Sequence, residues 1–157
     1  MVRQVTVQVG IGYDSHRFAE GRKLILGGVE LPAGKGLAGH SDADVLTHAI
    51  IDSLLGATGQ GDIGTHFPDD DEQFRDAVSL DLLRTVVGMV GGTIVNVDAT
   101  LILEAPKLAS HREAIEASLK EATGSRVNVK ATTNEGMGWI GRGEGIACIA
   151  VSSIEFQ

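Results

Sequence analysis

The chain has 157 residues, of which 43% are hydrophobic and 22% are charged. This composition excludes a disordered chain, a collagen-like repeat and a coiled coil, and the length suits a single domain over residues 1–157. The formal net charge of −8 at pH 7 argues against a nucleic-acid-binding surface, because contact with the phosphate backbone needs a basic face. An acidic protein that handles phosphates needs metal ions or backbone amides to offset the charge.

The cysteine count and the hydropathy pattern predict a cytoplasmic protein. Cys148 is the single cysteine, so an intrachain disulfide cannot form and a reducing compartment fits. Residues 1–9 alternate polar and apolar side chains, unlike the continuous apolar segment of a signal peptide or an Arg- and Ser-rich transit peptide. No stretch approaches the length of apolar sequence that crosses a bilayer, so we expect no membrane association.

The N-terminal quarter of the chain predicts a strand followed by a hairpin. Valines alternate with polar residues from Val5 to Ile11, which is typical of a half-buried strand. The same period places Asp14 and His16 on the polar face, opposite the valines. Residues 23–32 predict a short hairpin that turns at Gly27-Gly28, and a glycine-rich loop follows it.

A buried helix is predicted from Ser41 to about Ala57. Ser41 and Asp44 resemble a capping pair at its start. At 100° per residue, Asp44, His48 and Asp52 share one sector, whereas apolar residues occupy almost all the rest. We therefore expect this helix to be buried nearly all round.

The rest of the chain alternates helices and strands. In order, the pattern predicts a loop at 59–74, a helix at 79–90, a strand at 93–104, a helix from Pro106 to Gly124, and strands at 127–133 and 145–156. Within the strand at 93–104, we expect Val95 and Val97 to share one face. The last strand is apolar on both faces, so both faces should be covered, one of them by a neighbouring subunit.

This order predicts an α+β protein. We expect a mixed β-sheet with the helices packed on one face, a ferredoxin-like sandwich, together with the small hairpin. No internal repeat or linker divides the chain.

Histidines and carboxylates stand at spacings that suit a metal. Asp14 and His16 lie two apart on a strand, and Asp44 and His48 lie four apart on a helix. Neutral imidazole and carboxylate suit a tetrahedral zinc with one open position. The alternative is that each histidine is an isolated polar residue, and spacing alone does not choose which histidines bind.

Two other segments are weaker signals. Gly141–Gly145 is a glycine-dense turn with Arg142 as its cation, but it has neither the dinucleotide-binding nor the Walker A spacing. The run Asp69–Asp71 suits a divalent cation or a solvated acidic turn. Neither a Gly-x-Ser-x-Gly segment nor a Cys/His pair indicates a covalent nucleophile, and Cys148 fits a core position.

Several segments together match one family, in order along the chain. They are Gly12–Phe18; Gly39–Asp44 with His48; Gly61–Gly64 followed by Phe67–Asp69; Ala105–Lys107; and Ala131–Glu135 with Gly141–Ala147. Over roughly residues 9–154 the sequence resembles the 2-C-methyl-D-erythritol 2,4-cyclodiphosphate synthases of the non-mevalonate isoprenoid pathway. The His-Ser-Asp-x-Asp helix start and the Gly-Arg-Gly-Glu-Gly-Ile-Ala segment are the most specific parts.

The resemblance implies a phosphorus–oxygen lyase. The family converts 4-diphosphocytidyl-2-C-methyl-D-erythritol 2-phosphate into the cyclic 2,4-diphosphate and releases CMP. The 2-phosphate of the substrate attacks the β-phosphorus, so no enzyme nucleophile is needed. The resemblance further implies a homotrimer with active sites between neighbouring subunits.

It also implies roles for particular residues. Asp14, His16 and His48 would hold Zn²⁺, and Glu135 would help to hold a second ion, Mg²⁺ or Mn²⁺. His40 and Thr133 would act on the transition state. The substrate would contact a larger set that includes several of these: Asp14, Ser15, His16, His40, Ser41, Asp62, Ile63, Gly64, Phe67, Asp69, Asp71, Leu103, Glu104, Ala105, Pro106, Lys107, Leu108, Ala109, Thr132, Thr133, Asn134, Glu135, Trp139 and Arg142.

Four positions depart from the pattern of the family. Gly136 stands where many members carry Lys, Val78 where Asp is common, Trp139 where Phe is common, and Ile149 where relatives often have an acidic residue facing the trimer axis. Two other functions remain open. One is a zinc-dependent phosphoesterase in which water attacks the phosphate, and the other is a non-catalytic trimeric nucleotide-binding module.

Overall fold

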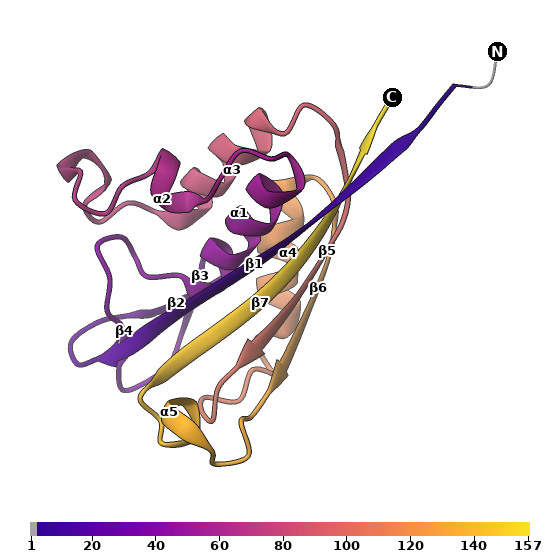
Figure 1. Ribbon diagram of the computed structural model, residues 1–157. Coiled ribbons are helices and arrows are strands. Elements are labelled where there is room, and N and C mark those ends of the chain that lie inside the picture. The colour runs from indigo at the N-terminus through magenta and orange to yellow at the C-terminus, as the bar shows by residue number, and fades with distance from the viewer. Residues whose placement is uncertain (1–2) are drawn as a thin grey trace.

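The computed structural model describes residues 3–157 as one sheet with helices on one side (Figure 1). The strands are β1 (Thr6–Ala19), β2 (Leu24–Leu26), β3 (Val29–Leu31), β4 (Gly36–Leu37), β5 (Thr93–Ile102), β6 (Arg126–Thr132) and β7 (Gly145–Phe156). The helices are α1 (Val45–Ala57), α2 (Ile63–His66), α3 (Ser79–Met89), α4 (Arg112–Thr123) and α5 (Gly138–Gly141), with a 3₁₀ turn, η1 (Glu72–Phe74).

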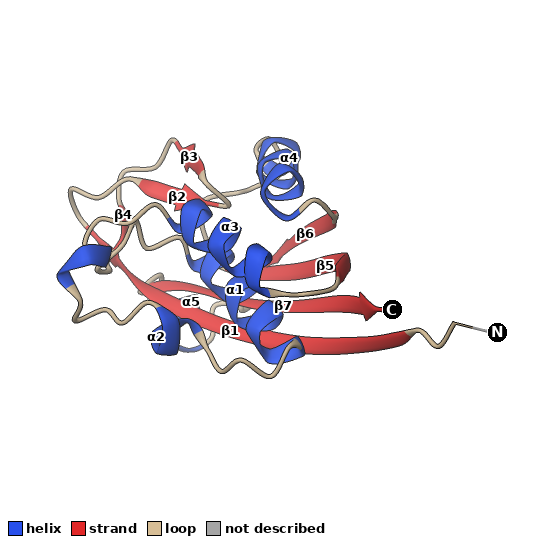
Figure 2. Cartoon of the chain, turned by 90° about the horizontal axis from the view of Figure 1, so that it is seen from above, coloured by secondary structure: helices blue, strands red, loops and turns tan. Residues whose placement is uncertain are grey.

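The five-stranded sheet is mixed and has the order β4-β1-β7-β5-β6. Among the described strands only β5 and β6 pair in parallel, and α4 connects them. Figure 2 shows α1, α3 and α4 on one side of this sheet, with the hairpin β2–β3 on the same side. The α+β prediction is confirmed. The ferredoxin-like part is wrong, because the main elements follow the order β-α-α-β-α-β-β rather than β-α-β-β-α-β.

The face of β1 that packs against the helices carries glycine rather than valine. A Cβ on Gly12 would lie 1.9 Å from the carbonyl oxygen of Ala49, and one on Gly10 would lie 2.0 Å from that of Ser53. These two glycines therefore allow the backbone of α1 to approach the strand. In a single subunit the valines are exposed, so the expectation that they form the buried face of the strand is wrong there. Asp14 and His16 do lie on the face opposite the valines, as expected.

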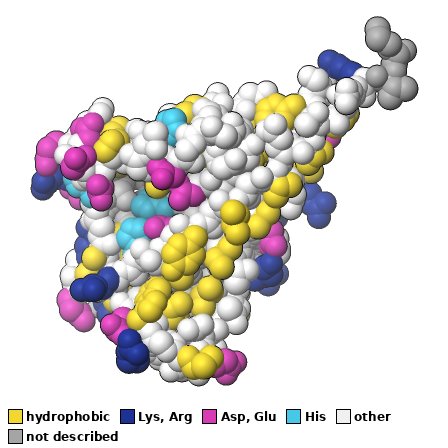
Figure 3. All heavy atoms as spheres, in the orientation of Figure 1, with side chains coloured by type: hydrophobic (Ala, Val, Ile, Leu, Met, Phe, Trp, Pro, Cys, Tyr) yellow, Lys and Arg dark blue, Asp and Glu magenta, His cyan; other side chains and the backbone are white. Residues whose placement is uncertain are grey.

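The apolar face of β1 instead points away from the helices. Val9 is 64% exposed and Ile11 is 70% exposed, and Ile149 and Val151 on β7 lie in register beside Tyr13 and Ile11. Figure 3 shows a hydrophobic band that follows these strands across one face of the molecule. We call Val5, Val7, Val9, Ile11, Tyr13, Val95, Ile149 and Val151 the outer apolar face.

Helix α1 begins after Asp44, so the expected cap at Ser41 is wrong. Asp44 accepts hydrogen bonds from the Thr47 amide at 3.0 Å and the Thr47 hydroxyl at 2.7 Å. It also accepts the amides of Gly27 and Gly28, at 2.9 and 2.7 Å. One buried carboxylate thus caps the helix and fastens it to the predicted hairpin turn. Nearly every residue of α1 is buried, as expected.

Two further predictions about elements are corrected. Helix α4 begins at Arg112 rather than Pro106, because residues 103–111 form a loop; its end at Gly124 is as expected. Val95 does not share the face of Val97, because a register shift between Ile94 and Asn96 turns Val95 outward. Cys148 is buried in the core, as predicted.

No helix among residues 3–157 is long and apolar enough to span a membrane. The two ends of the described chain lie at the same end of the sheet, because Thr6 pairs with Phe156.

Candidate active site

Strand β1 and helix α1 bring two histidines and one carboxylate together. Asp14 Oδ2 lies 3.0 Å from His16 Nδ1 and 3.2 Å from His48 Nδ1. Within the described residues this is the only group of three or more His, Cys, Asp or Glu side chains whose ligand atoms converge, all within 4.8 Å of one another. The glycines of β1 make this convergence possible, because they let α1, which carries His48, approach the strand just before Asp14 and His16.

The electrostatics of this triad suit a bound cation. Burial would raise the pKa of Asp14, but the adjacent imidazoles of His16 and His48 hold that pKa below its usual range. Burial would lower the pKa of His48, but Asp14 outweighs it and raises that pKa. His16 Nδ1 is buried and lies 3.0 Å from Asp14 Oδ2, but it makes no hydrogen bond of good geometry within the described residues. One carboxylate and two imidazoles whose ligand atoms converge are a donor set that fits a zinc ion.

The sequence left Asp44 open as a ligand, and the structure removes it from the triad. Its two oxygens are occupied by four donors at the start of α1. Asp52, in the same sector, accepts the amide of Ile63 at 2.7 Å and so holds the start of α2.

A cavity of about 310 Å³ opens over the triad. Its lining brings together six more of the predicted site residues: His40, Ser41, Ile63, Gly64, Phe67 and Asp69. In Figure 3 the histidines gather in a hollow beside the hydrophobic band. Phe74 and Leu82 also line this cavity. Sequence patterns do not single them out, because Phe74 stands alone in a charged loop and Leu82 is one of several apolar residues of a helix.

Three predicted residues on this side do not line the cavity. Asp62 is exposed and caps α2 through the amide and hydroxyl of Thr65. Asp71 caps η1 through Gln73, and its carbonyl oxygen lies 3.0 Å from His40 Nε2. Ser15 lies on β1 between Asp14 and His16, so its exposed side chain points to the opposite face.

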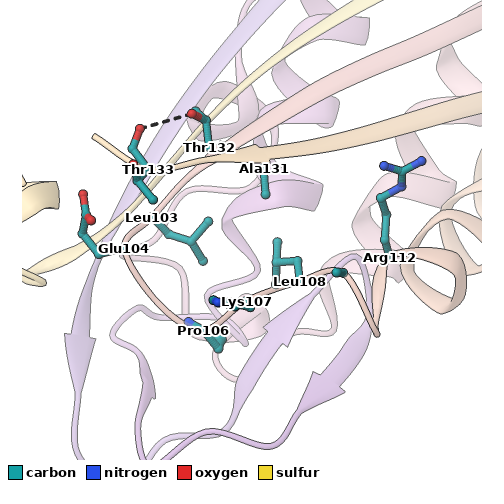
Figure 4. Close-up of a pocket in the computed structure, with 10 residues that line it drawn as sticks. Leu103, Glu104, Pro106, Lys107, Leu108, Arg112, Ala131, Thr132 and Thr133 are labelled. Carbon is teal, nitrogen blue, oxygen red and sulfur yellow. Dashed lines mark hydrogen bonds between the residues drawn. The ribbon is translucent and has the colours of Figure 1, made fainter. Parts of the chain in front are cut away.

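A second cavity, of about 380 Å³, lies between the loop after β5 and the end of β6 (Figure 4). It is lined by eight predicted residues, Leu103, Glu104, Pro106, Lys107, Leu108, Ala109, Thr132 and Thr133, together with Ala131 and Arg112. Figure 4 shows Thr132 and Thr133 across from Pro106 and Lys107, with Arg112 at one end. Arg112 was not predicted, because the sequence placed it inside a helix rather than at a helix start.

Glu104 organises the loop that follows β6. Its Oε1 accepts the amides of Asn134 at 2.9 Å and Gly136 at 3.3 Å. Glu135 has a positive φ of 54°, and its amide donates to Thr133 Oγ1 at 3.2 Å. Gly136 also has a positive φ, of 72°, a conformation that glycine adopts without strain.

The remaining predicted residues lie at the edge of the second cavity or beyond it. Ala105 lines a neighbouring cavity of about 280 Å³ with Phe18 and Lys35. Trp139 is partly exposed on α5, and Arg142 follows it and pairs with Glu144 at 2.7 Å. Within the part of the chain that is described, the cavity over the triad and the second cavity share no lining residue.

These features define a class of protein. It is an α+β protein with a cation site of two histidines and one carboxylate, and with a separate pocket beside two threonines and a lysine. The YgbB family model matches residues 7–155. The chain belongs to the YgbB family, among the 2-C-methyl-D-erythritol 2,4-cyclodiphosphate synthases, and the expected enzyme class, a phosphorus–oxygen lyase, is confirmed.

Similar curated and solved proteins support this assignment. The chain is 54% identical to the synthase of Alkaliphilus oremlandii over 94% of its own length and 98% of the relative. It is 57% identical to that of Halalkalibacterium halodurans over 92% and 96%. A solved synthase in a CDP-bound form matches with a TM-score of 0.85 at 36% identity, over 92% and 98% of the two chains. The bifunctional IspDF of Campylobacter jejuni matches with a TM-score of 0.94 at 37% identity, over 98% of this chain and 43% of that one.

Proposed function

We propose that this protein cyclises 4-diphosphocytidyl-2-C-methyl-D-erythritol 2-phosphate to 2-C-methyl-D-erythritol 2,4-cyclodiphosphate and releases CMP. The observation that carries the proposal is the convergence of Asp14, His16 and His48 in a chain that is more than half identical to synthases of this name. The oxygen of the 2-phosphate forms a bond to the β-phosphorus, and the bond between that phosphorus and the oxygen bridging to CMP breaks.

The chemistry asks the protein mainly to position two phosphate groups that repel each other. Zinc, held by Asp14, His16 and His48, would supply positive charge and polarise a phosphoryl oxygen. His40, which lines the same cavity, would act on the transition state, and Ser41 beside it would contact the substrate. Holding both groups in one pocket can contribute about 7–11 kcal/mol in an aligned intramolecular reaction.

The second cavity suits the cytidine diphosphate end of the substrate. Lys107 and Arg112 line it and offer positive charge for phosphate oxygens. The Thr133 hydroxyl, at the mouth of this cavity, would act on the transition state. Glu135, on the adjoining loop, would help to hold a second cation, Mg²⁺ or Mn²⁺, whose charge would offset that of the phosphates. A solved relative with CDP bound supports this assignment.

We further propose a homotrimer in which each active site combines the two cavities from neighbouring subunits. Within one described chain the cavities share no lining residue, so one subunit alone offers each half of the site separately. The outer apolar face supports assembly, since exposed apolar patches of this kind mark protein interfaces.

The proposal is tested with Asp14→Asn and His48→Ala. Both variants should lose bound zinc and nearly all production of the cyclic diphosphate, because each removes a ligand while the fold is kept. His111→Ala, a histidine outside both cavities, is the control and should keep both. Retention of zinc and turnover by Asp14→Asn would contradict the ligand assignment. A linear phosphate product instead of the cyclic one would favour a phosphoesterase, and no turnover by zinc-loaded wild type would favour a binding module.

A further inference from the structure

His48 makes contacts on the side of its ring that faces away from the triad. Its Nε2 lies 2.8 Å from the hydroxyl of Ser79, the first residue of α3. The Ser79 hydroxyl in turn donates to Asp42 Oδ1, and the Ser79 amide donates to Asp42 Oδ2 at 3.0 Å. Asp42 lies just before α1 and His48 lies in its first turn. The contacts among Asp42, Ser79 and His48 therefore connect the starts of α1 and α3 to the triad.

The chemistry of these groups fixes where the protons lie. An ionised carboxylate only accepts, so the hydroxyl proton of Ser79 points to Asp42. The oxygen of Ser79 is then free to accept a hydrogen bond, and the neighbouring Nε2 of His48 must be the donor. In the neutral ring, Nδ1 therefore carries the lone pair, and Nδ1 is the nitrogen that lies 3.2 Å from Asp14 in the triad.

Burial shields these hydrogen bonds from water. Ser79 is fully buried and His48 is 8% exposed, so little water competes for Nε2. Ser41 Oγ is also within 3.3 Å of Nε2, a longer contact from an oxygen that already accepts the amide of Ala43. Val78, the residue before α3, offers no side-chain cap, and Asp42 accepts the first amide of that helix instead. Asp42 is thus held by both α3 and the amide of Asp44, at 3.2 Å.

We propose that Ser79 and Asp42 are positioning residues that set the tautomer and orientation of His48 for metal binding. This inference rests on the proposed zinc site. It gives Ser79 and Asp42 a role in metal binding although neither contributes a ligand atom to the triad. Partners of this kind, which hydrogen-bond the distal nitrogen of a histidine ligand, contribute about 10- to 100-fold to metal affinity in other proteins.

The test measures zinc affinity by competition with a chromophoric chelator, without substrate. Ser79→Ala should weaken zinc binding by about 10- to 100-fold. Ser79→Thr keeps the hydroxyl and should restore most of the affinity. The matched control is Ser53→Ala, which removes another fully buried hydroxyl, one that bonds Ile50 and Ser152 rather than a histidine. It should keep wild-type zinc affinity even if the protein unfolds at a lower temperature.

Asp42→Asn provides a second variant of nearly the same size, in case Ser79→Ala does not fold. Asparagine has one acceptor oxygen in place of two, so it cannot keep the separate hydrogen bonds from the Ser79 hydroxyl to Oδ1 and from the Ser79 backbone amide to Oδ2, and zinc binding should again weaken. Wild-type zinc affinity in a folded Ser79→Ala or Asp42→Asn variant would overturn the proposal. Equal losses in Ser79→Ala and Ser53→Ala would also overturn it, because they would indicate a general packing effect. Failure of the wild type to bind zinc would instead remove the triad assignment, and this inference with it.

Discussion

At the scale of single residues, a proton and a metal ion compete for His48 in the triad. The side chain of Asp14 stabilises the charged form of His48, so the His48 pKa lies above its ordinary value of 6.5 although burial opposes the charge. A metal ligand must be neutral imidazole, so zinc binding displaces that proton. The same carboxylate that helps to hold a cation therefore also makes protons stronger competitors for His48.

This competition predicts a pH dependence of zinc affinity. Below the raised His48 pKa, apparent zinc affinity should fall by about tenfold per pH unit for one displaced proton. The fall should begin at a higher pH than for an ordinary histidine. Chelator competition over a pH series, corrected for the chelator's own protonation, measures it. A zinc affinity that stays constant from about pH 8 to pH 6 would contradict the assignment of His48 as a ligand.

Which of these residues could be predicted depends on how local their geometry is. The alternation of a strand places Asp14 and His16 on one side, and this follows from the sequence directly. The choice of His48 rather than Asp44 does not, because both lie on the same sector of α1. It depends on the amides of Gly27 and Gly28, which come from the hairpin and occupy Asp44.

At the scale of elements, the distance between β1 and α1 decides whether the triad forms. Gly12→Ala would place its methyl group 1.9 Å from the backbone oxygen of Ala49. Helix and strand would have to separate, so we expect a loss of about 1–3 kcal/mol or more in the free energy of unfolding. Weaker zinc binding should accompany that loss. Urea unfolding measures the first effect and chelator competition the second.

Gly34→Ala is the matched control for Gly12→Ala. Gly34 is a loop glycine, and a Cβ added to it would have nothing within 4 Å. The stability and zinc affinity of this variant should therefore be those of the wild type. Equal stability of the Gly12 and Gly34 variants would mean that the strand and helix tolerate a wider spacing than the structure has.

A second element-scale prediction concerns the loop after β6. Glu104→Ala removes the acceptor of the Asn134 and Gly136 amides, so residues 133–136 should lose their fixed geometry. We expect CDP to bind about tenfold more weakly, the size of one such hydrogen-bond contribution. Calorimetric titration with CDP measures this. Glu104→Gln retains one acceptor oxygen and should bind CDP more tightly than Glu104→Ala; the reverse order would contradict this role.

Element boundaries were harder to predict than element types. The sequence predicts that helix α1 is buried nearly all round, and it is, because apolar residues occupy almost all of its surface. The start of α4 was predicted six residues too early, since Pro106 is favoured at a helix start but here lies in the loop that lines the second cavity. The inward face of β1 was also missed, because alternation identifies two faces without saying which one a helix covers.

At the scale of the whole molecule, the outer apolar face and the separation of the two cavities have one explanation. A strand pair with Ile11 and Val151 side by side leaves apolar side chains exposed unless another surface covers them. In the trimer that we propose, covering them with like subunits would also bring one subunit's triad near a neighbour's second cavity. The sequence indicated this through the last strand, which is apolar on both faces.

This explanation predicts that one charge on this face disrupts assembly. Ile149 pairs with Tyr13 and is 38% exposed, and Ile149→Asp would bring three like charges together in a trimer, at a cost of several kcal/mol in desolvation. Sedimentation velocity should show a shift toward monomer, and turnover should fall while each chain keeps its zinc. Val78→Asp makes a similar change at an apolar residue that is 51% exposed beside α3, and it should leave the sedimentation coefficient unchanged. A trimer that withstands Ile149→Asp would place Ile149 outside the subunit interface, and a wild-type monomer with full turnover would place the completed active site within a single chain.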